Sequence, residues 1–269
     1  MYDFDYRAPE GVAEALELLA QSEDAKLLAG GHTLLPAMKQ RLAAPSLLID
    51  LRNIAELRGI SCEGDRLCIG AMETHHDVAT NPVVQAALPG FAALAAMIGD
   101  LHVRHRGTIG GSVANNDPAA DYAAGLLALD ATIVTTTREI DGQDFFCGLF
   151  TTALEEGEIL THILLPVDRQ FGYAKFANPA SRYAIAGVAV SRGGDGVRVA
   201  VTGAGADGVF RWTEAEAALD ADFSVAALDG LVPDPAGIND DMHASSDYRA
   251  ALVGEMAKRA VSEAIRFSR

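Results

Sequence analysis

LLAGGHTLLPAMK at residues 27–39 and TIGGSVANNDPAADY at residues 108–122 are the two stretches on which the interpretation of this sequence depends. Each contains a pair of adjacent glycines. A Gly-Gly pair has no Cβ atoms and tolerates positive φ, so its backbone can approach an anion closely. In the first stretch a predicted strand leads into the glycines and a helix follows, with Pro36 acceptable only in the first helical turn. A strand-to-helix turn of this kind suits a pyrophosphate.

Taken alone, each stretch is also compatible with an ordinary turn or helix cap. The first lacks the G-x-G-x-x-G spacing of a dinucleotide fold. The second is followed by a dense polar run that includes Asn115, Asn116, Asp117 and Asp121. Two glycine cradles in one small chain fit a ligand that has two phosphates and bridges two lobes. A dinucleotide such as FAD is such a ligand.

The rest of the chain divides into three parts around these stretches. Residues 1–57 alternate strand and helix patterns and predict a small βαβαβ unit. Residues 58–169 contain a hairpin pattern at 59–70, short helices, and later strand patterns at 131–137, 145–147 and 158–165. This second unit is expected to be α+β with a mostly antiparallel sheet. Residues 170–269 predict a three-stranded antiparallel sheet followed by helices, the last at 248–267.

Composition excludes several functional classes. The chain has 269 residues and a formal net charge of −16, which argues against a nucleic-acid surface and against docking on an anionic membrane. No stretch is long and apolar enough to insert in a membrane, and the N-terminus lacks a signal-peptide pattern, so a cytoplasmic protein is expected. Three widely spaced cysteines cannot form a four-thiolate iron–sulfur or zinc site.

The two glycine stretches closely resemble the two FAD motifs of a known family. The patterns A-G-G-H-T-L-L-P-x-M-K and T-I-G-G-x-x-A-x-x-D-P-x-x-D are similar to those of the FAD-binding medium subunits of the xanthine dehydrogenase and aerobic carbon monoxide dehydrogenase family, the molybdenum hydroxylases. The resemblance continues through GEILTHILLP (157–166), GYAKF (172–176), SRYAIAGVAV (181–190) and HASSDYRAALVGEMAKRAV (243–261). It covers nearly the whole chain and says little about the substrate.

The resemblance implies a two-lobed FAD-binding domain of the vanillyl-alcohol-oxidase-like type at 1–57 and 58–169. A C-terminal domain like that of carbon monoxide dehydrogenase flavoproteins follows at 170–269. It also implies the FAD-contacting residues, with Tyr183 beside the isoalloxazine ring. Ser112 departs from the family, which usually has Asn there, and it keeps a donor and an acceptor with a shorter reach. The implied residues are Leu28, Ala29, Gly30, Gly31, His32, Thr33, Leu34, Thr108, Ile109, Gly110, Gly111, Ser112, Asp121, Leu160, Lys175 and Tyr183.

The resemblance implies partners as well. A large subunit would carry molybdopterin and oxidise the substrate, and a small subunit would carry two [2Fe–2S] clusters, in a dimer of heterotrimers. Electrons would pass from those clusters through FAD to an external acceptor such as a quinone, NAD or oxygen. Two alternatives remain open: a free-standing FAD oxidase or reductase of the same fold, and an assembly subunit that has lost its flavin.

The histidines outside the glycine stretches give no independent site. His75 and His76 are adjacent and cannot both face one metal ion, so they are interpreted as capping or surface residues. His102 and His105 have metal-ligand spacing, but Arg104 and Arg106 beside them oppose a divalent cation. No metal site is predicted in this chain.

Overall fold

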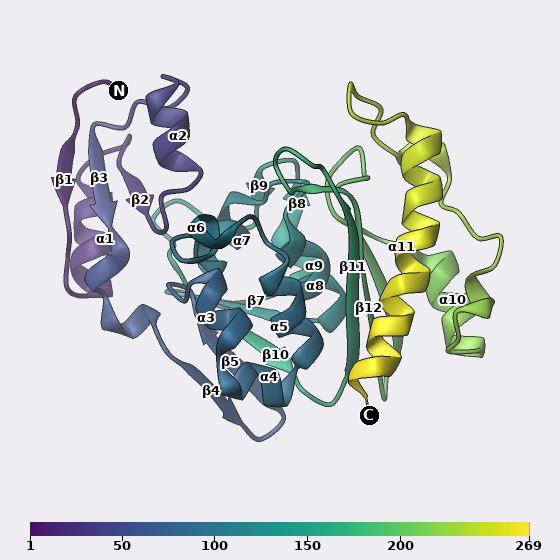
Figure 1. Ribbon diagram of the computed structural model, residues 1–269. Helices are drawn as coiled ribbons and strands as arrows, with labels where there is room; N and C mark the ends of the chain where they lie inside the picture. The colour runs from purple at the N-terminus through teal and green to yellow at the C-terminus, as the bar shows by residue number, and fades with distance from the viewer. Residues whose placement is uncertain (269) are drawn as a thin grey trace.

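The first part of the chain forms a small parallel sheet, on the left in Figure 1. The computed structural model describes residues 1–268. The strands lie in the order β1-β3-β2, and the two helices are the crossovers between them. This is the βαβαβ order expected from the sequence. The elements are β1 (Asp5–Arg7), α1 (Val12–Ala20), β2 (Lys26–Leu28), α2 (Leu34–Lys39) and β3 (Leu47–Asp50), followed by η1 (Leu51–Asn53) and η2 (Ala55–Leu57).

A five-stranded antiparallel sheet in the order β4-β5-β10-β6-β7 forms the middle of the molecule. It confirms the predicted mostly antiparallel arrangement. Its strands are β4 (Ile60–Glu63), β5 (Arg66–Gly70), β6 (Thr132–Thr135), β7 (Glu139–Asp141) and β10 (Leu160–Pro166). The helices between β5 and β6 are α3 (His75–Thr80), α4 (Pro82–Ala87), α5 (Pro89–Ala96), α6 (Leu101–Arg104), α7 (Ile109–Asn115) and α8 (Asp121–Leu129).

The segment after β7 differs from the prediction of a single strand at 145–147. It begins as a short helix, α9 (Gly142–Phe145), and continues as a separate small hairpin of β8 (Phe146–Gly148) and β9 (Thr151–Thr152). Asn116, in a left-handed conformation with φ 43°, donates from its amide to the carbonyls of Gly148 and Thr151, both at 2.8 Å. This long-range contact helps hold the hairpin in place, and local sequence patterns cannot reveal it.

The last part contains a four-stranded antiparallel sheet in the order β11-β12-β13-β14, so the prediction of three strands was wrong by one. The additional strand has only two residues, Phe210 and Arg211, which is too short to show an alternating pattern. The elements are β11 (Gln170–Ala177), β12 (Ala184–Gly193), β13 (Gly196–Thr202), β14 (Phe210–Arg211), α10 (Thr213–Ala221), η3 (Ala226–Leu228), η4 (Pro235–Gly237) and α11 (Ser246–Phe267).

Apolar packing joins the last sheet to its neighbours on both faces. Helix α11 lies along β11 and β12 on one face (Figure 1), and α5 and α8 pack against β11, β12 and β13. Phe171 and Tyr173 of β11 belong to the same buried cluster as Leu67 and Ile69 of the middle sheet. The middle and last sheets therefore share one hydrophobic core. Within residues 1–268, no helix is both long and apolar enough to cross a membrane.

Candidate functional site

A cleft of about 1080 Å³ runs between the first and middle parts of the chain. This volume lies just above the range of about 300–1,000 Å³ typical of small-molecule sites, so the cleft has room for a large ligand such as a dinucleotide. All the residues implied by the sequence resemblance line it except Ile109 and Lys175. The cleft-lining members of that set are Leu28, Ala29, Gly30, Gly31, His32, Thr33, Leu34, Thr108, Gly110, Gly111, Ser112, Asp121, Leu160 and Tyr183.

The first glycine stretch presents free backbone donors. None of the N–H groups of residues 30–34 bonds to an acceptor within residues 1–268. Gly31 has φ 75°, a left-handed conformation that favours glycine. A Cβ on Gly30 would overlap the carbonyl oxygen of Arg106 and lie 2.7 Å from Cα of Gly107. This loop therefore touches the segment that leads into the second glycine stretch, and its open N–H groups suit an anion.

The second glycine stretch has a different construction from the first. Thr108 is the N-cap of α7, and its Oγ1 accepts from the N–H of Gly111 at 3.2 Å. The N–H of Ile109 bonds to Glu73 O and that of Gly110 to Ala71 O, at 3.0 and 2.9 Å. The amides of Ile109, Gly110 and Gly111 are thus already used within the protein. Here the glycines serve close packing, since a Cβ on Gly110 would lie 2.6 Å from that of Ala71.

Lys175 lies behind the cleft wall and pairs with Asp121. Its Nζ is 2.9 Å from Oδ2 of Asp121 and donates to the carbonyl of Arg182 at 2.9 Å. The hydroxyl of Tyr173 also donates to Asp121. Burial raises the pKa of the Asp121 carboxyl, and the Lys175 ammonium opposes that rise. Lys175 therefore anchors the turn whose next residue, Tyr183, lines the cleft.

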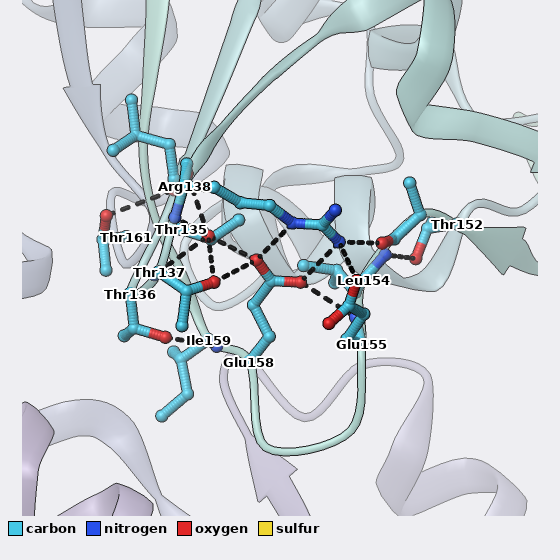
Figure 2. Close-up of polar contacts among 12 residues, drawn as sticks. Thr135, Thr136, Thr137, Arg138, Thr152, Leu154, Glu155, Glu158, Ile159 and Thr161 are labelled. Atoms are coloured by element: carbon cyan, nitrogen blue, oxygen red, sulfur yellow. Dashed lines mark hydrogen bonds and ion pairs between the residues drawn. The ribbon is translucent and has the colours of Figure 1, made fainter.

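An acidic loop at residues 154–159 also lines the cleft. Figure 2 shows the polar contacts of this loop. The carboxylate of Glu158 accepts from the hydroxyls of Thr135 and Thr137 at 2.6 and 2.7 Å. Arg138 donates to it at 3.1 Å and the N–H of Glu155 at 2.8 Å. Chiefly because of the Arg138 contact, the pKa of Glu158 falls to about 2. Sequence reasoning identified only Leu160 in this neighbourhood.

His75 is a cleft residue that the sequence interpretation placed wrongly. It was expected to be a capping or surface histidine, but it is 5% exposed and lines the cleft. Its spacing from Val78 and Ala79 gave a signal, because residues three and four apart share one helix face and both are apolar. The expectation fits the neighbouring His76 better, which is half-buried and stacks on His105 with ring centroids 4.0 Å apart.

Comparison with known proteins agrees with this geometry. The family model described as the FAD binding domain in molybdopterin dehydrogenase matches residues 2–168. The chain belongs to this family. It is 38% identical to the carbon monoxide dehydrogenase medium chain of Hydrogenophaga pseudoflava, over 97% of this chain and 96% of that one. It is 36% identical to the nicotine 6-hydroxylase medium subunit of Paenarthrobacter nicotinovorans, over 96% of both.

The solved structures add a match in three dimensions. The carbon monoxide dehydrogenase structure from Hydrogenophaga pseudoflava superposes with a TM-score of 0.89 and 40% identity, covering 99% of this chain and 98% of that one. This chain is therefore an FAD-binding oxidoreductase subunit of the molybdopterin dehydrogenase family. Its own residues fit FAD: the volume, the free amides at 30–34 and the glycines that allow close approach all meet in one cleft.

Proposed function

We propose that this chain relays electrons, holding FAD so that it receives them from [2Fe–2S] clusters of a partner subunit and passes them to an external acceptor. The observation that carries the proposal is the large cleft in which both glycine stretches meet. FAD supplies the redox chemistry, while the protein supplies binding and orientation. The chain has three cysteines, fewer than a four-thiolate cluster needs, so the proposal assigns the clusters to a partner chain.

Each part of the cleft then has a defined task. The free amides of residues 30–34 would hold the pyrophosphate, and the hydroxyl of Ser112 would add a polar contact from the opposite wall. Tyr183 is 43% exposed, so its ring can cover the flavin. Partial burial, together with the charges of Asp117 and Asp121, raises the pKa of its phenol, which would therefore stay neutral. Lys175 and Asp121 would act by holding the turn that carries Tyr183.

The expected partners are a molybdopterin-binding large subunit and a [2Fe–2S] small subunit, in a dimer of heterotrimers. The full-length match to relatives named medium chain or medium subunit supports such an assembly. We also propose the division into units 1–57, 58–169 and 170–269, the first two forming a vanillyl-alcohol-oxidase-like FAD domain. The three main sheets support this division. A cytoplasmic location stays a prediction that cell fractionation tests.

Purification of the chain from its native host tests the proposed function. We expect a complex with one molybdenum-containing and one iron–sulfur chain and with flavin absorbance, and reduction of the flavin when substrate is added. A chain that stays alone and turns over a small substrate would instead be a free-standing flavoenzyme. A chain that shows no flavin absorbance after incubation with FAD would have an assembly role only. Either result would refute the electron-relay proposal.

A further inference from the structure

His75 has an unpartnered ring nitrogen at the wall of the cleft. The side chain is 5% exposed and its Nδ1 lies 3.3 Å from the hydroxyl of Tyr122, which is itself fully buried. The other nitrogen, Nε2, has no hydrogen-bond partner within residues 1–268. It lies beside Gly107, where an added Cβ would be 2.6 Å from it. His75 and Gly107 both line the cleft, so a nitrogen at this position that the chain leaves unpartnered is available to a ligand in the cleft.

The surroundings fix which ring nitrogen carries the proton. Burial, and after it electrostatic interaction with His32 and Arg104, lowers the pKa of His75 to about 4, so the ring is neutral at physiological pH. Burial raises the pKa of Tyr122 well above its usual value, so its hydroxyl keeps its hydrogen. Nδ1 of His75 is the one hydrogen-bond partner of this buried hydroxyl within residues 1–268, so the hydroxyl hydrogen is satisfied by donation to Nδ1. A neutral imidazole that accepts at one nitrogen carries its hydrogen on the other. Nε2 is therefore a donor.

The position of this donor indicates what it binds. Gly107, beside Nε2, is also the residue that Gly30 touches. The free amides of residues 30–34 begin at the same contact. A neutral donor there can add a hydrogen bond to an oxygen of an anionic ligand without burying a further charge. The ligand part that matches clustered amides between two loops is a pyrophosphate with its adjoining hydroxylated chain.

We propose that His75 is a cofactor-binding residue whose Nε2–H donates to an oxygen of the pyrophosphate–ribityl part of FAD. Tyr122 is then a positioning residue, because its hydroxyl holds the imidazole in the tautomer with the hydrogen on Nε2. This inference rests on FAD occupying the cleft. The FAD site then includes a contact from α3 and a positioning residue from α8 in addition to the two glycine stretches.

A matched pair of variants separates binding from packing. His75→Gln keeps a donor at about the reach of Nε2, whereas His75→Met has nearly the same shape and no donor. FAD is titrated into flavin-free protein purified with any subunits that accompany it, and flavin fluorescence is followed. The dissociation constant should rise about tenfold in the Met variant, as for one lost hydrogen bond to a charged group. It should stay within about twofold of wild type in the Gln variant. His76→Gln is the control and should change nothing.

A second readout tests where on FAD the contact lies. A hydrogen bond to the pyrophosphate–ribityl part acts equally on oxidised and reduced FAD, so the flavin midpoint potential should be the same in all variants. A potential shift in His75→Met would overturn that placement. Equal FAD affinity of the Gln and Met variants would overturn the binding role. Wild-type protein that fails to take up FAD would instead refute the FAD site as a whole.

Tyr122→Phe keeps the inference testable if His75→Met fails to fold. It removes the partner of Nδ1 and leaves Nε2 in place. A tautomer-fixing role predicts an FAD dissociation constant raised about threefold, a fraction of one hydrogen bond. A purely structural contact between His75 and Tyr122 predicts a lower melting temperature with unchanged FAD affinity, and that result would overturn the inference.

Discussion

Replacing Gly30 by alanine tests whether the two glycine stretches must touch for the cleft to bind FAD. An alanine Cβ would overlap the carbonyl oxygen of Arg106 and lie 2.7 Å from Cα of Gly107. Both are backbone atoms, so no side-chain rotation relieves the contact. Overpacking of this kind costs about 1–3 kcal/mol. That free energy must appear either as strain in the folded protein or as separation of the two loops.

Two measurements together detect either outcome. Strain would lower the melting temperature by roughly 2–4 °C per kcal/mol for a chain of this size. Separation of the loops would weaken FAD binding by about tenfold per 1.4 kcal/mol. We expect the second effect to dominate, because the amides of residues 30–34 depend on the loop position. Gly30→Ala protein with both wild-type melting temperature and wild-type FAD affinity would refute the reasoning.

Two further glycines provide a graded comparison. Alanine at Gly111 would place its Cβ 2.9 Å from Oγ1 of Thr108 and 3.2 Å from Cβ of Ala29. The side chain of Thr108 can shift, so we expect a smaller loss of FAD affinity than for Gly30→Ala. Gly194 has no atom within 4 Å of an added Cβ, and Gly194→Ala should leave both quantities near wild type. Equal changes in FAD affinity and melting temperature at all three positions would show that the contacts around each glycine do not determine these changes.

Three other substitutions have defined outcomes in urea unfolding. Lys175→Met leaves the buried Asp121 carboxylate without its ion-pair partner and should lower the free energy of unfolding by about 3–5 kcal/mol. Adding Asp121→Asn should recover part of this loss, and no recovery would contradict a paired charge. Glu158→Gln should lower the free energy of unfolding by about 3 kcal/mol above pH 4.5, because folding lowers the pKa of Glu158 from 4.5 to about 2. The difference from wild type should vanish as the pH falls towards 2, where the carboxyl becomes protonated in the folded protein as well. A difference that does not change with pH would refute this link between the pKa of Glu158 and stability. Arg249→Met removes the hydrogen bonds from Arg249 to two backbone carbonyls and to Asp241, and it should lower the free energy of unfolding by about 3 kcal/mol. An unchanged free energy of unfolding would show that these contacts do not anchor α11.

The fold was predictable where local pattern carries the information. The strand and helix spacing of the first 57 residues was enough to predict the βαβαβ unit, and the long helix at the end was expected at 248–267 and found at Ser246–Phe267. The two-residue strand β14 was missed because it forms only by pairing Arg211 with Ala200 on β13. The same holds for the hairpin of β8 and β9, which Asn116, the residue directly after α7, contacts.

The glycines of the candidate site were predictable from the sequence, whereas the hydrogen-bond partners that hold the two glycine stretches were not. Because the glycines and their neighbouring residues have a characteristic order, the amino-acid sequence alone indicates an FAD cleft. The two glycine stretches look alike as sequence, and only the folded chain separates them. Residues 30–34 keep free amides, whereas Ile109 and Gly110 bond to Glu73 and Ala71. These partners come from the segment between β5 and α3, so chain folding alone decides which amides are left for a ligand.

The amino-acid sequence was sufficient to identify the family and the cofactor, because glycine and the residues beside it express backbone requirements directly in the chain. Of the 16 residues that the resemblance implies, 14 line the cleft, and many other lining residues were not predicted. The use of charged and titratable groups, in contrast, depends on tertiary contacts. These contacts pair Lys175 with Asp121 and with the carbonyl of Arg182, and they bury His75 with its Nδ1 beside the hydroxyl of Tyr122. The physical reason is that burial and pairing depend on elements far apart in sequence, such as α3 against α8 and α8 against β11, which meet only in the folded chain.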